Sequence, residues 1–197
     1  EGIELRQEWK RVKDSFEKQN YEVLKNVEGT DFITSMTLWN SYEKSLVNGS
    51  GVKCKKKDVL SLRRSVFDDK KAGMEQGFVD AARFLIKEGI FASANVPYNT
   101  QYVPLAAIFA YDKSHEKLLD HAQYREKLRK WYWCGVFGEL YGSANETRYA
   151  LDIKDVFAWM KDDSLIPDTV SRSSFQANRL LTLQTRNSAA YKGVMAL

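Results

Sequence analysis

Apolar residues recur at helical spacing along almost the whole chain, and proline is nearly absent. The 197 residues include only three prolines, Pro97, Pro104 and Pro167. Proline interrupts helices, and alternating strand patterns are scarce, so the long stretches between these residues are predicted to be helical. The predicted fold class is all-α, an irregular multi-helix bundle.

Apolar stripes at helical spacing predict the individual helices of the amino-terminal half. The first three stripes are Leu5, Trp9, Val12 and Phe16; then Phe32, Met36, Trp39 and Leu46; then Met74, Phe78, Ala81, Ala82 and Leu85. Thr30 or Asp31 is expected to cap the second of these helices, and the segment from Asn48 to Gly51 to end it. Gly89 is the expected carboxy-terminal cap of the third.

The carboxy-terminal half predicts further helices after a turn-rich connector at residues 95–104. Pro104 is expected to begin a short helix, and Ser114 a longer one that runs through Leu118 to Val136. Another helix is expected around residues 153–160, with Asp152 near its start, where a carboxylate complements the helix dipole. Residues 175–197 predict one or two closing helices.

The chain is long enough to bury a substantial core, and residues 1–197 are predicted to form a single helical domain. A sub-boundary near residues 89–104 is the alternative. The sequence begins Glu1-Gly2-Ile3 without an initiator methionine and stops within an apolar helical pattern. It is therefore expected to be an excised piece of a longer polypeptide.

Charge and cysteine content set the expected environment. The formal net charge of +4 permits contact with nucleic acid without requiring it, because 26 acidic residues offset 30 basic ones. The two cysteines, Cys54 and Cys134, are too few for a disulfide framework, which favours the reducing cytoplasm. No apolar run approaches the ~20 residues of a membrane span, so no membrane partner is expected.

Two basic runs are the candidate nucleic-acid contacts, because Lys and Arg neutralise phosphates and neighbouring aromatic rings can stack on unpaired bases. The interpretation of both runs as solvated helix faces stays open, since Asp58 and Glu126 interrupt them. The first run comprises Lys53, Lys55, Lys56, Lys57, Arg63 and Arg64, and the second comprises Arg125, Lys127, Arg129 and Lys130 beside Trp131 and Tyr132.

Other candidate sites carry weaker signals. Glu139, Glu146 and Arg148 surround the Tyr141-Gly142 turn, and the simplest interpretation is a structural polar cluster, with a carboxylate metal or base site as the alternative. The segment from Arg186 to Lys192 is interpreted as a polar helix start. His115 and His121 are six residues apart, which does not place both on one helical face. Neither metal nor cofactor is predicted, nor any catalytic residue.

Several spaced segments resemble the helical region of a bacterial domain family of unknown function that includes the GmrSD-type modification-dependent restriction nucleases. These segments are Asp31-Phe32, Cys54–Leu60, Gln76–Phe78 with Phe84-Leu85, Pro97-Tyr98, Val103–Leu105, Trp131–Arg148 and Asn187–Gly193. Members of that family carry an amino-terminal ParB-like domain, and many end in a His-Asn-His-type nuclease domain. The signatures of both domains are absent from this sequence, so the resemblance transfers no catalytic residue.

The resemblance implies a non-catalytic helical connector or interaction module of a restriction or phage-defence protein. Its partners would be the flanking domains and the DNA backbone. A free-standing DNA-binding module is the second hypothesis, and it requires cations clustered on one surface. A metal-dependent hydrolase is the third, and it requires carboxylates that converge in space.

Overall fold

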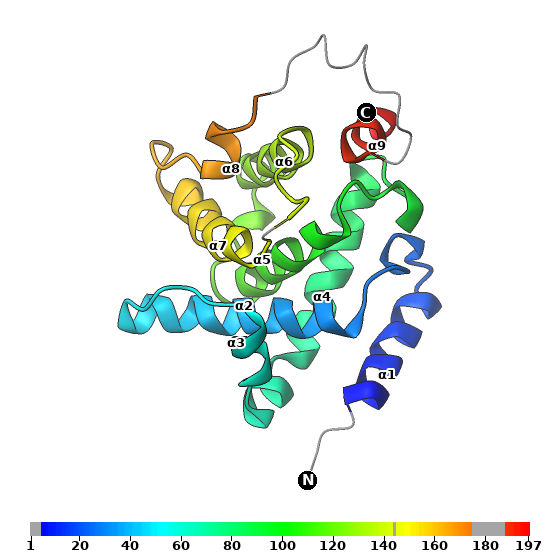
Figure 1. The fold of residues 1–197 in the computed structure, drawn as a ribbon, viewed down its shortest axis with the longest axis vertical. Coiled ribbons are helices and arrows are strands. Elements are labelled where there is room, and N and C mark those ends of the chain that lie inside the picture. Colours follow the sequence, from blue (N-terminus) through cyan, green and yellow to red (C-terminus); the bar gives the residue numbers. More distant parts are fainter. Residues whose placement is uncertain (1–4, 144, 175–187) are drawn as a thin grey trace.

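Helices form all the regular secondary structure in residues 5–143, 145–174 and 188–197, which the computed structural model describes (Figure 1). The α-helices are α1 (Leu5–Lys18), α2 (Gly29–Asn48), α3 (Lys56–Leu60), α4 (Arg64–Lys87), α5 (Tyr102–His115), α6 (Ala122–Phe137), α7 (Asn145–Lys161), α8 (Asp168–Ser171) and α9 (Ala189–Ala196). Short 3-10 helices are η1 (Glu22–Leu24), η2 (Ser93–Asn95), η3 (Asn99–Gln101) and η4 (Leu118–Asp120). The all-α multi-helix prediction is confirmed.

The helix α5 is the centre of the bundle, and it contacts α2, α4 and α7. Its residues 102–108 are all buried, because neighbouring helices surround it. The approach of α4 is closest at Gly77, where an added Cβ would lie 2.5 Å from the carbonyl oxygen of Ala106. Only glycine at this position allows the two backbones to pack so tightly.

Residues on both sides of the 89–104 segment share one core. From the first half, α2 packs against α5 and α7 of the second, and Tyr42 on α2 stacks on Phe157 of α7 with ring centroids 5.4 Å apart. Aromatic contacts also tie α1 to the bundle through Phe16 and Phe78, whose centroids are 6.2 Å apart. The segment that was the expected alternative boundary therefore does not divide the core.

The first three apolar stripes lie on the helices that they predict, but two of their residues are exposed and the start of α2 differs from the prediction. All their residues are buried or half-buried except Leu5, at the start of α1, and Leu46, which are 42% and 55% exposed. Leu46 is in the last turn of α2, where the helix extends past its neighbours. The predicted cap at Thr30 or Asp31 is wrong, because Glu28 is the N-cap residue and α2 begins at Gly29. Asp31 acts from within the first turn by accepting a hydrogen bond from the Glu28 N–H at 2.9 Å.

The predicted helix from Ser114 to Val136 is wrong, because the chain reverses between α5 and α6. Both carboxylate oxygens of Asp112 accept backbone hydrogen bonds, from the N–H of Leu118 at 2.9 Å and of Leu119 at 3.1 Å. Lys117 adopts a left-handed conformation with a φ of 55°. These local contacts end α5 at His115, and α6 starts at Ala122.

Three other element boundaries differ from the predictions. Pro104 is the third residue of α5 and not its first. Asp152 lies in the middle of α7 and is buried, so it does not complement a helix start. The predicted closing helices are represented by α9 within the described residues, while positions 175–187 lie outside them.

Candidate nucleic-acid interface

The first basic run lies on the segment that leads from α2 into α3 and α4. The side chains of its four lysines are exposed, because the segment lies on the outside of the bundle. Within the described part of the chain, the run makes one ion pair, between Arg64 and Asp68 at 2.8 Å. The cations without an ion pair there are Lys53, Lys55, Lys56, Lys57 and Arg63.

The backbone of this run is fixed by local polar contacts. The N–H of Lys53 donates to the Ser41 hydroxyl at 2.7 Å, and the N–H of Lys55 donates to Asp58 at 2.9 Å. Asp58, which interrupts the positive run in the sequence, thus satisfies the start of α3. The charged ends of the lysines stay available while their backbone is held.

Cys54, in the middle of the run, points inward. Its thiol is buried and lies 3.2 Å from the carbonyl oxygen of Glu146 on α7. Burial raises the pKa of this thiol to about 12, with a further contribution from the neighbouring carboxylates of Glu146 and Asp58. The thiol is therefore protonated at neutral pH and acts as a packing group and not as a nucleophile.

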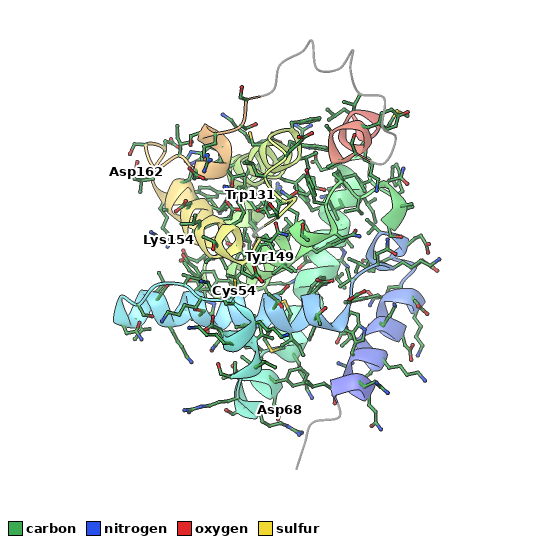
Figure 2. The ribbon with its side chains drawn as sticks, in the orientation of Figure 1. Cys54, Asp68, Trp131, Tyr149, Lys154 and Asp162 are labelled. Atoms are coloured by element: carbon green, nitrogen blue, oxygen red, sulfur yellow. The ribbon has the colours of Figure 1, made fainter. Side chains whose placement is uncertain are left out.

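A groove of about 450 Å³ separates the run from α7. Lys53, Lys55 and Lys57 line one side, and Lys154 of α7, which is labelled in Figure 2, lines the other. Asp58 and Glu146 also line the groove, so lysines outnumber carboxylates by four to two. We call Lys53, Lys55, Lys56, Lys57 and Lys154 the lysine surface.

Lys154 was not among the predicted contact residues. Its exposed position follows from the helical spacing of the buried residues Ile153, Val156 and Trp159. Its proximity to the first basic run depends on the packing of α7 against α2, which joins residues about a hundred positions apart. Sequence spacing carries no signal for that proximity.

The second basic run makes contacts within the bundle. Arg125 donates to the carbonyl oxygens of Leu119 and Asp120 at 2.8 and 2.7 Å, which secures η4. Lys127 lies 2.5 Å from Asp163, and Arg129 pairs with Glu88 at 2.8 Å. Lys130 is exposed, with its ammonium 5.9 Å from the centroid of the Trp159 ring.

The aromatic residues beside the second run are core residues. Trp131, Tyr132 and Trp133 are all buried, and Trp131 meets Tyr141 edge to face with ring centroids 6.4 Å apart. Buried rings cannot stack on a nucleic-acid base without unfolding of the surrounding helices. The structure thus supports the solvated or internal interpretation for most of the second run, and it leaves the first run as the stronger candidate.

The predicted cluster of Glu139, Glu146 and Arg148 takes a different form. Arg148 pairs with Asp168 at 3.0 Å and donates to the Thr169 hydroxyl at 3.1 Å. Glu139 is exposed in the turn after α6, with a φ of 53°, and Glu146 is exposed at the start of α7. The partner of Arg148 is therefore an acid about 20 residues further along the chain, at the start of α8.

A buried polar network next to Arg148 was missed by the sequence prediction. Asp152 accepts hydrogen bonds from the hydroxyl groups of Tyr141 and Thr169. Burial raises the pKa of the Asp152 carboxyl, although the two hydrogen bonds oppose this shift. The spacing of Tyr149, Asp152 and Val156 places Asp152 on the buried face of α7, and that signal was present in the sequence.

No group of three His, Cys, Asp or Glu side chains suited to a metal ion occurs in residues 5–143, 145–174 and 188–197. Nor does any helix of that part have the length and apolar character that crossing a membrane requires. Of the polar segment near the end, Arg186 and Asn187 lie outside the described residues. Ser188 caps α9 by accepting a hydrogen bond from the Tyr191 N–H at 3.2 Å.

Comparisons with known proteins find one similar sequence to set beside this geometry. It is a protein of Methanocaldococcus jannaschii named "Uncharacterized protein MJ0686", 26% identical over 205 residues. The alignment covers 99% of this chain and 33% of the relative, so the chain spans about a third of the relative's length. No protein-family model matches the chain, and no solved structure matches it.

Proposed function

We propose that the chain is a non-catalytic helical connector or interaction module of a GmrSD-like restriction or phage-defence protein that acts in the cytoplasm. Its partners are the flanking domains of the parent protein, and its lysine surface contacts the DNA backbone. The spaced segments from Asp31-Phe32 to Trp131–Arg148 support the family part of this proposal. An alignment that covers only a third of the relative is consistent with a module of a longer protein.

The observation that supports the proposed DNA contact is that the lysines of the first basic run are exposed and unpaired within the described residues. Lys53, Lys55, Lys56 and Lys57 are exposed, and hydrogen bonds hold the backbone of their segment. None of the four makes an ion pair within the described residues. Lys154 adds a fifth cation from the opposite side of the groove. Unpaired ammonium groups held on one surface are the arrangement that neutralises phosphates and releases their counterions.

The test is fluorescence anisotropy of a labelled DNA duplex titrated with the chain over a salt series. Binding is expected to weaken linearly in a log–log plot, with a slope of about −0.9 for each neutralised phosphate. The paired variant Lys56→Ala/Lys57→Ala is expected to flatten that slope by about 2. Its matched control is Lys10→Ala/Lys18→Ala, which removes two exposed lysines of α1 that make no ion pair with any residue that the structure describes.

An equal loss of affinity in both paired variants would assign the binding to overall charge and not to the lysine surface. Absence of binding at low salt would remove DNA from the list of partners and leave the connector role alone. The free-standing DNA-binding module, the second candidate, shares the same surface. It is favoured over the connector if the isolated chain binds a specific duplex with an affinity well above that for an unrelated duplex.

A further inference from the structure

A second hollow, of about 360 Å³, lies on a different part of the molecule from the lysine surface. It is bordered by α4, α5 and η4, and it shares no residue with the groove beside α3. Its volume falls in the range of pockets that hold small organic ligands. We call it the aromatic hollow, because Phe84 and Phe109 line it together with Leu119.

The two phenyl rings form a fixed apolar floor. Phe84 and Phe109 are half-buried, so part of each ring faces the hollow. Their centroids lie 6.1 Å apart, and Phe84 also packs edge to face on the buried Tyr132 at 5.4 Å. The planes of Phe84 and Phe109 are tilted by 56° to each other, so a planar ligand ring can stack on one of them and meet the other at an angle, against rings that the core already holds.

The rim of the aromatic hollow has an excess of positive charge. Five cations and three carboxylates line it, a formal excess of two. Asp80 is engaged by Arg83 at 3.1 Å and Lys113 at 3.2 Å. The Asp112 carboxylate is engaged by two backbone N–H groups, as described above.

Three rim cations make no ion pair within the described residues, and one of them, Arg125, is engaged by the carbonyl oxygens of Leu119 and Asp120. The other two, Lys87 and Lys117, are exposed. Lys117 has a left-handed backbone with a φ of 55°, at the position after a helix where glycine is the usual residue. A lysine there costs conformational energy that glycine would avoid. What lysine adds at this position is a cationic side chain on the rim.

We propose that the aromatic hollow binds one nucleotide unit, with its base packed against Phe84 and Phe109 and its phosphate held by Lys87 and Lys117. A phosphate monoester carries a charge of about −1.5 to −2 at pH 7, which matches the excess on the rim. Stacking on aromatic rings combined with cations is the general mode by which proteins hold unpaired bases. The unit can come from a free nucleotide or from a single strand.

The first experiment is isothermal titration of the chain with adenosine 5′-monophosphate at low salt, with adenosine and ribose 5-phosphate as half-ligands. The monophosphate is expected to bind at least about tenfold more tightly than either half, since stacking and charge contribute separately. Saturation-transfer NMR is expected to show transfer to the base protons. Equal binding of ribose 5-phosphate and the monophosphate would overturn the aromatic part of the proposal.

Lys117→Gly is the decisive variant. Glycine relieves the left-handed backbone, so the melting temperature is expected to stay constant or to rise, while affinity for the monophosphate falls about threefold or more. Lys87→Glu is expected to weaken binding further, and Lys10→Glu on α1 is the control with the same charge change. Unchanged affinity in Lys117→Gly and Lys87→Glu would overturn the proposal.

The tetranucleotide of deoxyadenylate distinguishes the two sources. Tighter binding of this strand than of the monophosphate, weakened by the same two variants, assigns the site to a base in a single strand. Binding of the monophosphate without the strand assigns it to a free nucleotide. Failure of both ligands overturns the proposal but leaves the lysine surface untouched, because the duplex titration depends on Lys56 and Lys57 and not on the aromatic hollow.

Discussion

The carboxylate of Asp152 accepts a hydrogen bond from the hydroxyl of Thr169 at 2.5 Å, and this contact joins the middle of α7 to α8. The other carboxylate oxygen accepts the hydroxyl of Tyr141, from the turn after α6. Arg148 donates to the same Thr169 hydroxyl. One buried carboxylate thus connects three consecutive elements of the carboxy-terminal half, so its partners are expected to contribute directly to stability.

Thr169→Val is expected to lower the free energy of unfolding by roughly 1–3 kcal/mol. Valine keeps the shape of threonine but lacks the hydroxyl, and it leaves a buried carboxylate oxygen without its donor. Thr147→Val is the control, because Thr147 is an exposed threonine on α7, the helix that carries Asp152, and substitutions at exposed positions typically change stability by less than about 0.5 kcal/mol. Urea unfolding measures both. Equal losses in the two variants would mean that the Asp152 contact contributes nothing specific.

The Asp152 carboxyl also predicts a pH dependence of stability. Burial raises its pKa in the folded state, so the folded protein binds a proton more tightly than the unfolded chain does. Its contribution is therefore fully present below the unfolded pKa of about 3.9 and is lost as the pH rises through the raised folded pKa.

The variant Asp152→Asn cannot titrate, so it isolates this contribution from those of other carboxylates. As the pH rises over that window, the unfolding free energy of the wild type is expected to fall relative to that of the variant. Chemical denaturation at a series of pH values provides the measurement. A difference that is constant with pH would show that the pKa of Asp152 is the same in the folded and unfolded states.

Trp131→Ala is expected to destabilise the chain by roughly 3–5 kcal/mol, because it removes a fully buried ring from the core. The loss should appear in thermal and urea unfolding. DNA affinity of the fraction that stays folded is expected to be unchanged. A normal melting curve with lost DNA binding would instead identify Trp131 as a stacking residue.

A single and a triple lysine variant test which cations stabilise the fold and which lie free on the surface. Lys127→Ala is expected to destabilise by about 1–2 kcal/mol, since the side chain is only 18% exposed and its ammonium donates to the Trp159 carbonyl oxygen at 2.5 Å. Replacing Lys55, Lys56 and Lys57 together with alanine is expected to leave the melting temperature nearly unchanged. Unfolding of the triple variant would show that the first basic run is structural.

Helical periodicity predicted the fold class because the buried stripes of α1, α2 and α4 follow one face of each helix. It predicted the wrong boundary at Ser114, because the reversal depends on the Asp112 side chain binding two backbone N–H groups, and the apolar pattern does not record such a contact. It also gave no correct assignment for two lysines: Lys127 was a predicted nucleic-acid contact, and Lys154 was not. Both are basic residues on helices, and only packing decides that the first is engaged internally and the second joins the lysine surface.

The inward contact of Cys54 has a consequence for binding energetics. A flexible loop of lysines would lose conformational entropy on meeting a ligand, and that loss would reduce the affinity. The thiol of Cys54, held at the Glu146 carbonyl oxygen, has already ordered this segment in the free protein. The lysines next to it are therefore preorganised, and a polyanion that engages them has only their side-chain rotamers left to immobilise.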